Sequence, residues 1–111
     1  MKRLMKKNES SGVWTHFMDM HSGGDCKLDP YEHIYIEAYE EQAVMIFEAE
    51  FKRDPNNVTC DCCGEDYSIS EYSSVERATE YQRKPYGKPE IQLEKYMEQD
   101  DVLFLFKGEV K

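Results

Sequence analysis

Three of the four cysteines are close together, at Cys60, Cys62 and Cys63. Cys60 and Cys63 form a Cys-x-x-Cys pair followed by Gly64, a spacing that lets two thiolates converge on one tetrahedral metal ion. The glycine frees the backbone to curl around such an ion. The metal that this arrangement favours is zinc, which needs four ligands. The remaining ligands would come from His21, Cys26, His16 or Cys62.

Two other interpretations of the cysteines stay open. The thiols could pack as small hydrophobic groups or lie idle in a loop. Cys60 and Cys63 could also form a redox pair, although such a pair would begin a helix after a strand, and here glycine and acidic residues follow. Since no secretory signal is recognisable, we expect reduced thiols rather than disulfides.

A second chemically capable set consists of His16, Asp19 and His21, at the end of a predicted strand beside the glycine pair 23–24. Two imidazoles and a carboxylate can bind a metal ion or act in general acid-base catalysis. Strand alternation places His16 and Asp19 on opposite faces unless a bulge intervenes. This set defines an alternative function: a small metal-dependent hydrolase or nucleotide-modifying enzyme whose metal activates water.

The strands that must position these residues are predicted from hydrophobic periodicity. Alternating apolar side chains predict strands over 13–20 and 33–38, which we expect to pair antiparallel. A continuous apolar run predicts a buried strand over 102–106. That run is also the longest uncharged apolar segment and is far too short to cross a bilayer, so no membrane association is expected.

The helices are predicted from apolar residues at three- and four-residue spacing and from their end signals. They cover 40–53, 74–83 and 89–99, and the cysteines lie in a loop predicted over 56–72. The resulting order is strand, strand, helix, helix, helix, strand. This order predicts an α+β fold with a small, mainly antiparallel sheet and helices packed on one face.

The length of 111 residues suits one domain. We expect a flexible basic head over 1–12 and a single α+β domain over 13–111. The head is the basic part of the chain, because it contains Lys2, Arg3, Lys6 and Lys7 and only one acidic residue. Direct nucleic-acid binding would depend on those four side chains and is not expected, because the formal net charge of the chain is -9.

The acidic body of the chain has two interpretations. Such charge can simply keep a small protein soluble, or it can attract a basic partner such as a nucleic-acid-binding protein. Four tyrosines in the second half of the chain are of a type favoured at protein interfaces, although half-buried core positions would explain them equally well. They are Tyr67, Tyr72, Tyr81 and Tyr86.

Three stretches of sequence carry a family resemblance: WTHFMDMHSGG over 14–24, HIYIEA over 33–38, and VTCDCCGEDYSISE over 58–71. Together they resemble a family of small, uncharacterised bacteriophage proteins, and the resemblance covers 12–83. Cys26 lies outside the shared pattern. The resemblance implies a phage origin and a site of action in the host cytoplasm, where small acidic phage proteins often bind and disable a host factor.

The leading functional prediction therefore combines the resemblance with the charge. We expect a non-enzymatic phage accessory protein whose acidic, tyrosine-rich surface binds a host protein, such as a defence or nucleic-acid-processing factor. Zinc bound through Cys60, Cys63, His21 and Cys62 would hold the cysteine loop.

Overall fold

The computed structural model describes residues 12–20, 28, 30–57 and 66–106. Its four strands are β1 (Trp14–Asp19), β2 (His33–Ile36), β3 (Tyr67–Tyr72) and β4 (Val102–Leu105). Its three helices are α1 (Glu40–Phe51), α2 (Val75–Arg83) and α3 (Leu93–Met97). Residues 1–11 of the predicted basic head lie outside the described residues.

The four strands form one sheet in the order β3-β1-β2-β4. β1 pairs antiparallel with both β2 and β3, whereas β2 and β4 are parallel. Two of the three pairings are antiparallel, and helices accompany the sheet. The predicted α+β class and the mainly antiparallel sheet are therefore confirmed.

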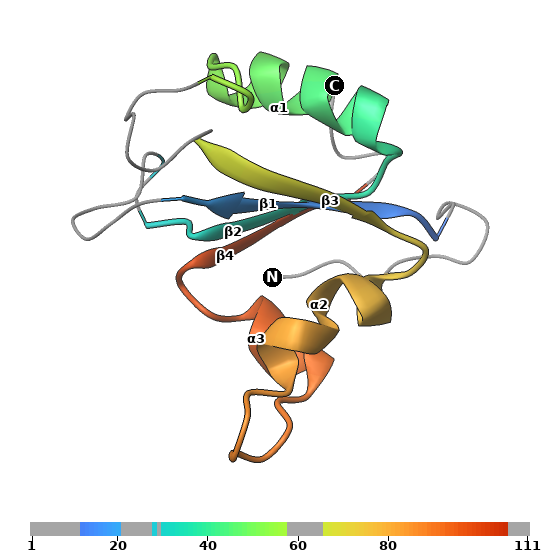
Figure 1. Cartoon of the computed structure of the whole chain (residues 1–111), viewed down its shortest axis with the longest axis vertical. Coiled ribbons are helices and arrows are strands. Elements are labelled where there is room, and N and C mark those ends of the chain that lie inside the picture. The colour runs from blue at the N-terminus through green and yellow to red at the C-terminus, as the bar shows by residue number, and fades with distance from the viewer. Residues whose placement is uncertain (1–11, 21–27, 29, 58–65, 107–111) are drawn as a thin grey trace.

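The helices cover both faces of the sheet, so their predicted placement on one face is wrong. α1 lies on one side, and α2 and α3 lie on the other (Figure 1). The reason is that the strands carry large apolar side chains on both faces: Trp14 and Phe17, three residues apart on β1, are both fully buried. Because successive side chains of a strand alternate, each face needs its own cover.

Each side of the sheet has its own core. On the α1 side, the ring of Phe47 packs against the rings of Phe17 and Tyr67, with centroid distances of 4.8 and 5.0 Å. On the other side, Trp14 makes edge contacts with Phe104 and Phe106 at 5.8 and 5.4 Å. The two sets of rings do not mix, since the sheet separates them.

Strand β3 lies inside the segment that the sequence predicts as a loop. Its inward-facing residues include Tyr67 and Ile69, but Ser68, Ser70 and Glu71 have low strand preference and hide the alternation. Pairing with the full length of β1 overrides that weak local preference.

The third helix is shorter than predicted. Gln92 has an extended backbone (φ -63°, ψ 145°) and precedes α3. The N–H of Ile91 donates to the carbonyl of Arg83 at 2.7 Å, at the end of α2. That bond fixes the chain before α3 in a non-helical conformation and ties the two helices together.

Candidate functional site

His16 and His33 form a buried pair on the side of the sheet covered by α2 and α3. His16 Nε2 and His33 Nδ1 are 2.9 Å apart, so one ring donates to the other. The two histidines are not directly opposite each other on β1 and β2, because the register pairs His16 with Tyr35 and His33 with Met18. Their hydrogen bond therefore runs diagonally between the strands. His33 was not singled out from the sequence, since a hydrogen bond between neighbouring strands depends on their register.

Burial keeps both imidazoles neutral at physiological pH. Burial, and then the adjacent His33, lower the pKa of His16 to about 3. Burial also lowers the pKa of His33, while the charges of Glu32 and Asp101 act in the opposite direction. A base of such low pKa is a poor proton acceptor near neutrality, so His16 is better suited to packing and hydrogen bonding than to general base catalysis.

A row of stacked rings continues from His16 across the sheet. The His16 ring stacks on Tyr35 at 4.4 Å between centroids, and Tyr35 stacks on Phe104 at 4.7 Å. The hydroxyl oxygens of Tyr35 and Tyr96 are 2.7 Å apart, which joins β2 to α3. Burial raises the pKa of both phenols, so this hydrogen bond persists between neutral groups.

The structure does not assemble the predicted set of His16, Asp19 and His21 within the described residues. Asp19 is the register partner of Tyr67, which packs against Phe47 on the α1 side. His16 stacks on Tyr35 on the opposite face. The two side chains thus lie on opposite faces, as strand alternation predicts. His21 lies outside the described residues.

The predicted zinc ligands Cys60, Cys62, Cys63 and His21, together with Cys26, also lie outside the described residues. Within the described ranges, no group of three or more His, Cys, Asp or Glu side chains could hold a metal ion. Backbone hydrogen bonds join the described residues that flank those segments. Met20 N–H donates to the carbonyl of Asp66 at 2.9 Å, and Asp66 N–H donates to the carbonyl of Asn57 at 2.7 Å.

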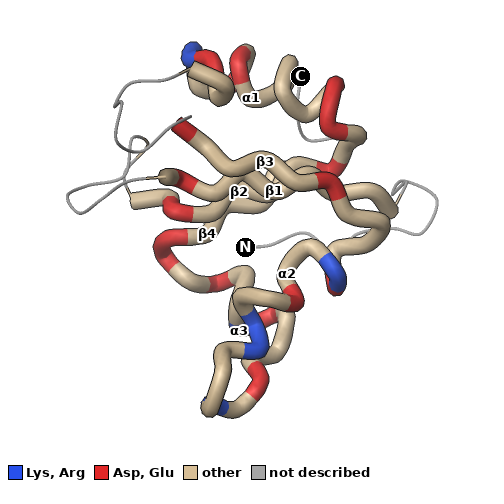
Figure 2. Tube along the Cα trace, viewed as in Figure 1, with Lys and Arg blue, Asp and Glu red and all other residues tan. Residues whose placement is uncertain are grey.

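Helix α1 is strongly acidic. The helix carries four glutamates and no lysine or arginine (Figure 2). The acidic residues, Glu40, Glu41, Glu48 and Glu50, are all exposed. Met45, which lies between Glu41 and Glu48 on one side of the helix, is 66% exposed, and Tyr39, which precedes the helix, is 57% exposed. Here "the α1 surface" denotes these six residues.

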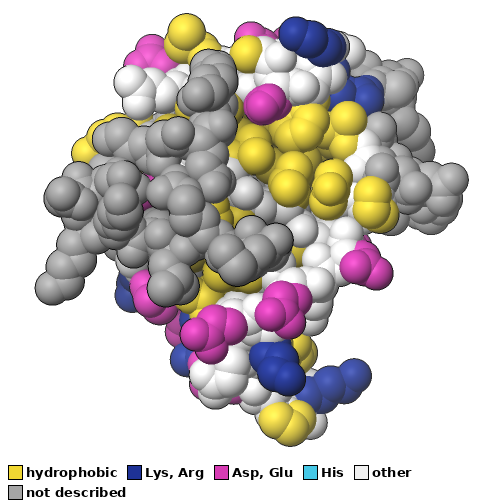
Figure 3. Space-filling view, turned by 180° about the vertical axis from the view of Figure 1, so that it is seen from behind, with side chains coloured by type: hydrophobic (Ala, Val, Ile, Leu, Met, Phe, Trp, Pro, Cys, Tyr) yellow, Lys and Arg dark blue, Asp and Glu magenta, His cyan; other side chains and the backbone are white. Residues whose placement is uncertain are grey.

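Apolar side chains also gather below α1 on the rear of the molecule (Figure 3). Several side chains that pack against the α1 core keep part of their area exposed. They include Val44 and Ile46 of α1 and Leu103 and Leu105 of the edge strand β4. The α1 side therefore combines surface charge with accessible apolar area.

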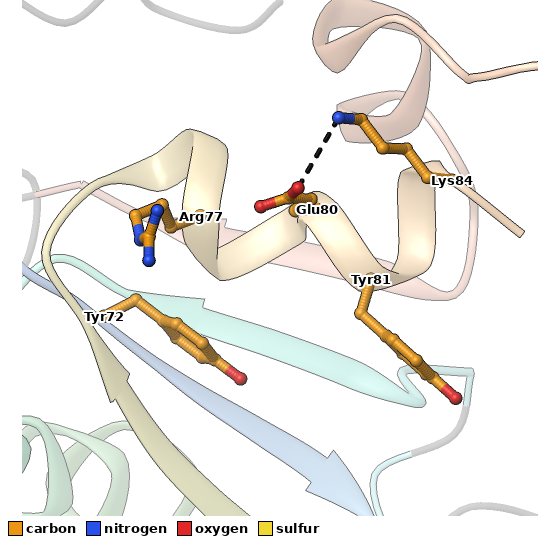
Figure 4. Close-up of a pocket in the computed structure, with 5 residues that line it drawn as sticks. All are labelled: Tyr72, Arg77, Glu80, Tyr81 and Lys84. Carbon is orange, nitrogen blue, oxygen red and sulfur yellow. Dashed lines mark hydrogen bonds and ion pairs between the residues drawn. The ribbon is translucent and has the colours of Figure 1, made fainter.

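On the opposite side of the sheet, α2 borders a shallow groove of about 400 Å³. We call this "the α2 groove"; its lining residues are Tyr72, Arg77, Glu80, Tyr81 and Lys84 (Figure 4). Lys84 Nζ lies 3.5 Å from Glu80 Oε2. Residue type alone predicts the two tyrosines as interface residues, but not the two cations. Their signal was the spacing of residues 77, 81 and 84, which places them on one side of a helix.

Comparison with known proteins returns no matching family model, no matching curated protein and no matching solved structure. Among the described helices, none has the length and apolar character needed to cross a membrane.

Proposed function

We propose that this chain is a small, non-enzymatic bacteriophage accessory protein that binds a host protein in the host cytoplasm through the α1 surface. The observation that carries the proposal is the exposed side of α1, where Glu41 and Glu48 lie about one helical turn before and after the exposed Met45. The partner would be basic, as a defence or nucleic-acid-processing factor with a phosphate-binding surface is.

In this proposal, surface charge attracts the partner and exposed apolar side chains supply the binding free energy. The carboxylates of α1 add to the formal net charge of -9, and such a field steers a basic partner toward the protein. Desolvated apolar or aromatic anchors supply most of the binding free energy in protein interfaces. Met45 and Tyr39, which already extend into solvent, are the anchors that we assign.

The internal geometry supports a non-enzymatic function over the alternative hydrolase. His16 is buried with a pKa of about 3, and Asp19 lies on the other face of the sheet. Neither placement favours a shared reaction centre. The buried hydrogen bonds of His16 and Tyr35 instead support a structural use of these polar side chains.

Zinc binding through Cys60, Cys63, His21 and Cys62 is a further part of the proposal. It is supported by the hydrogen bond between Met20 and Asp66, which joins the described residues next to His21 to those that follow the cysteines. Elemental analysis of protein purified without chelator should find one zinc ion per chain. The Cys60→Ser/Cys63→Ser variant should lose both the zinc and thermal stability; metal-free wild-type protein would exclude the zinc site.

The binding function can be tested by photo-crosslinking in bacterial cells. A photoreactive amino acid at position 45 should yield a discrete adduct with one host protein, because this exposed position lies between Glu41 and Glu48 on α1. The matched control places the same amino acid at the exposed Glu94, at the first turn of α3. We expect no comparable adduct from position 94.

Charge reversal on α1 tests whether its carboxylates are needed for the partner to bind. Glu41→Lys/Glu48→Lys should abolish the adduct at position 45, since both substitutions lie on the exposed side of the helix and leave its core residues unchanged. An adduct that persists in this variant, or equal adducts at positions 45 and 94, would contradict binding through the α1 surface.

A further inference from the structure

The α2 groove combines two aromatic rings with a small excess of positive charge, on a protein that is otherwise acidic. Tyr72 comes from β3 and is half-buried, whereas Tyr81 extends from the last turn of α2 and is 85% exposed. In Figure 4 the two rings lie on the same side of the helix. Exposed tyrosines of this kind supply rigid contact area at low entropic cost and are enriched in interfaces.

The two cations of the groove are not equivalent. Lys84 is engaged by Glu80, one helical turn before it, at 3.5 Å. Within the described residues, no carboxylate lies at ion-pair distance from the Arg77 guanidinium group. Figure 4 shows that group turned toward the side of the helix where Tyr72 lies. A guanidinium group can bind a carboxylate through two parallel hydrogen bonds, so Arg77 is the anion-binding member of the groove.

The net charge of the lining, one positive charge, limits the kind of ligand. Arg77 and Lys84 are offset by Glu80, which stands between them on the helix. A single-stranded nucleic acid presents one phosphate per nucleotide and needs a continuous cationic track. Glu80 interrupts such a track, and the charge of -9 opposes a long polyanion. A ligand with one carboxylate and an adjacent ring matches the groove better.

We propose that the α2 groove binds a linear segment of a second protein partner that carries one carboxylate side chain beside an aromatic or proline residue. Arg77 binds the carboxylate, and Tyr72 and Tyr81 contact the neighbouring ring. The volume of about 400 Å³ is at the low end of the roughly 300–1,000 Å³ of ligand pockets, which suits one or two side chains. This binding is independent of the α1 surface, which lies on the other side of the sheet.

The test is a selection of random displayed peptides on the full-length chain. The wild-type protein should enrich peptides with Asp or Glu beside Trp, Tyr, Phe or Pro. The most enriched peptide should then bind Arg77→Glu and Tyr81→Ala about tenfold more weakly or worse than wild type, in a titration followed by fluorescence anisotropy. Lys95→Glu, an exposed charge reversal on α3, should bind as wild type does.

Each alternative outcome overturns the proposal. Failure to enrich peptides, enrichment of peptides without acidic residues, or unchanged affinity in Arg77→Glu would exclude an acidic linear segment. Oligothymidine that binds with the same sensitivity to Arg77→Glu and displaces the peptide would assign the groove to nucleic acid. Self-association in sedimentation that Arg77→Glu abolishes would identify a second copy of the chain as the occupant. Thermal melting of every variant checks that the fold is retained.

Discussion

The two sides of the sheet are built on different principles. On the α1 side, aromatic and aliphatic side chains fill most of the core, with Thr15 and Asp19 as buried polar residues on the same face of β1 as Phe17. Helix α1 carries four exposed glutamates and no lysine or arginine. On the α2 and α3 side, hydrogen bonds between buried polar groups cross the core, at His16 with His33 and Tyr35 with Tyr96. The outer surface there mixes tyrosines with both signs of charge.

This difference indicates how stability and binding are distributed. The α1 side is stabilised by ring packing around Phe47 and by the buried Thr15 hydroxyl, which donates to the carbonyl of Ala38, and no titratable side chain takes part in these contacts except Tyr67. The other side depends on geometry and protonation, because a buried polar group that loses its partner is destabilising. Four measurements distinguish the two sides, from the largest expected change in the free energy of unfolding to the smallest.

The largest effect is expected from Phe47→Ala. Phe47 is fully buried at the centre of the α1 core and contacts the rings of Phe17 and Tyr67. Truncation of such a ring removes buried apolar area and leaves a cavity, so urea unfolding should show a loss of about 3–5 kcal/mol. Met45→Ala, on the exposed side of the same helix, should change stability by less than about 0.5 kcal/mol. Equal effects of the two substitutions would contradict the assignment of the α1 core.

Acid should destabilise the protein through the opposite side. The pKa of His16 is lowered to about 3 in the folded state from its ordinary value of about 6.5, so the unfolded state binds more protons between these values. The stability supplied by neutral His16 is therefore present above about pH 6.5 and falls as the pH decreases, by about 2 kcal/mol at pH 5. The lowered pKa of His33 acts in the same direction.

The measurement is the free energy of unfolding as a function of pH. His16→Gln should be less stable at neutral pH, but its stability should vary less between about pH 6.5 and pH 5, because one of the two imidazoles is removed. An NMR titration that gave His16 a pKa near its usual value of about 6.5 would refute the buried neutral pair.

The hydrogen bond between Tyr35 and Tyr96 should appear as coupling in a double-mutant cycle. Each single change to phenylalanine leaves the other hydroxyl without its partner and should cost about 1–2 kcal/mol. The double variant should be more stable than the sum of the single effects predicts, with a coupling of about 1 kcal/mol. Additive losses would mean that the two hydroxyls do not depend on each other.

The smallest effect concerns the start of α2. Ser74 Oγ accepts a hydrogen bond from the N–H of Arg77 at 3.2 Å, which caps the helix. Ser74→Ala should lower the free energy of unfolding by about 0.5–1 kcal/mol. Ser73→Ala, one residue earlier on an exposed side chain, is the matched control and should have little effect. A larger loss of stability in Ser73→Ala than in Ser74→Ala would indicate that Ser73, not Ser74, caps α2.

Local pattern predicts the fold class and six of the seven helices and strands found in the described residues. Strands β1, β2 and β4 and helix α1 carry strong hydrophobic periodicity, and their positions were predicted closely. The strand β3 was missed because its serines and Glu71 dilute the alternation, and its stability depends on pairing with β1. The placement of helices on two faces follows from burial on both faces of β1, where Trp14 and Phe17 are fully buried. The expectation of helices on one face did not take both of these apolar faces into account.

Some candidate functional residues could likewise be predicted from residue type, whereas others depend on contacts between elements. Tyr72 and Tyr81 could be singled out by residue type, since exposed tyrosines are favoured at interfaces. Arg77 and Lys84 became relevant when their positions around α2 were known. His33 could not be joined to His16 without the register of β1 and β2, because a diagonal hydrogen bond requires both the strand pairing and the ring orientations.

The measurement that tests the central claim most directly is the affinity of the host protein captured at position 45. Its Kd should be determined for the wild-type chain, for Glu41→Lys/Glu48→Lys and for Arg77→Glu at low and high salt. The account predicts that reversal of charge on α1 weakens binding about tenfold or more and removes most of its salt dependence, while Arg77→Glu binds as wild type does. Equal binding by the wild-type chain and the α1 variant would contradict the claim that the acidic side of this molecule is its partner-binding surface.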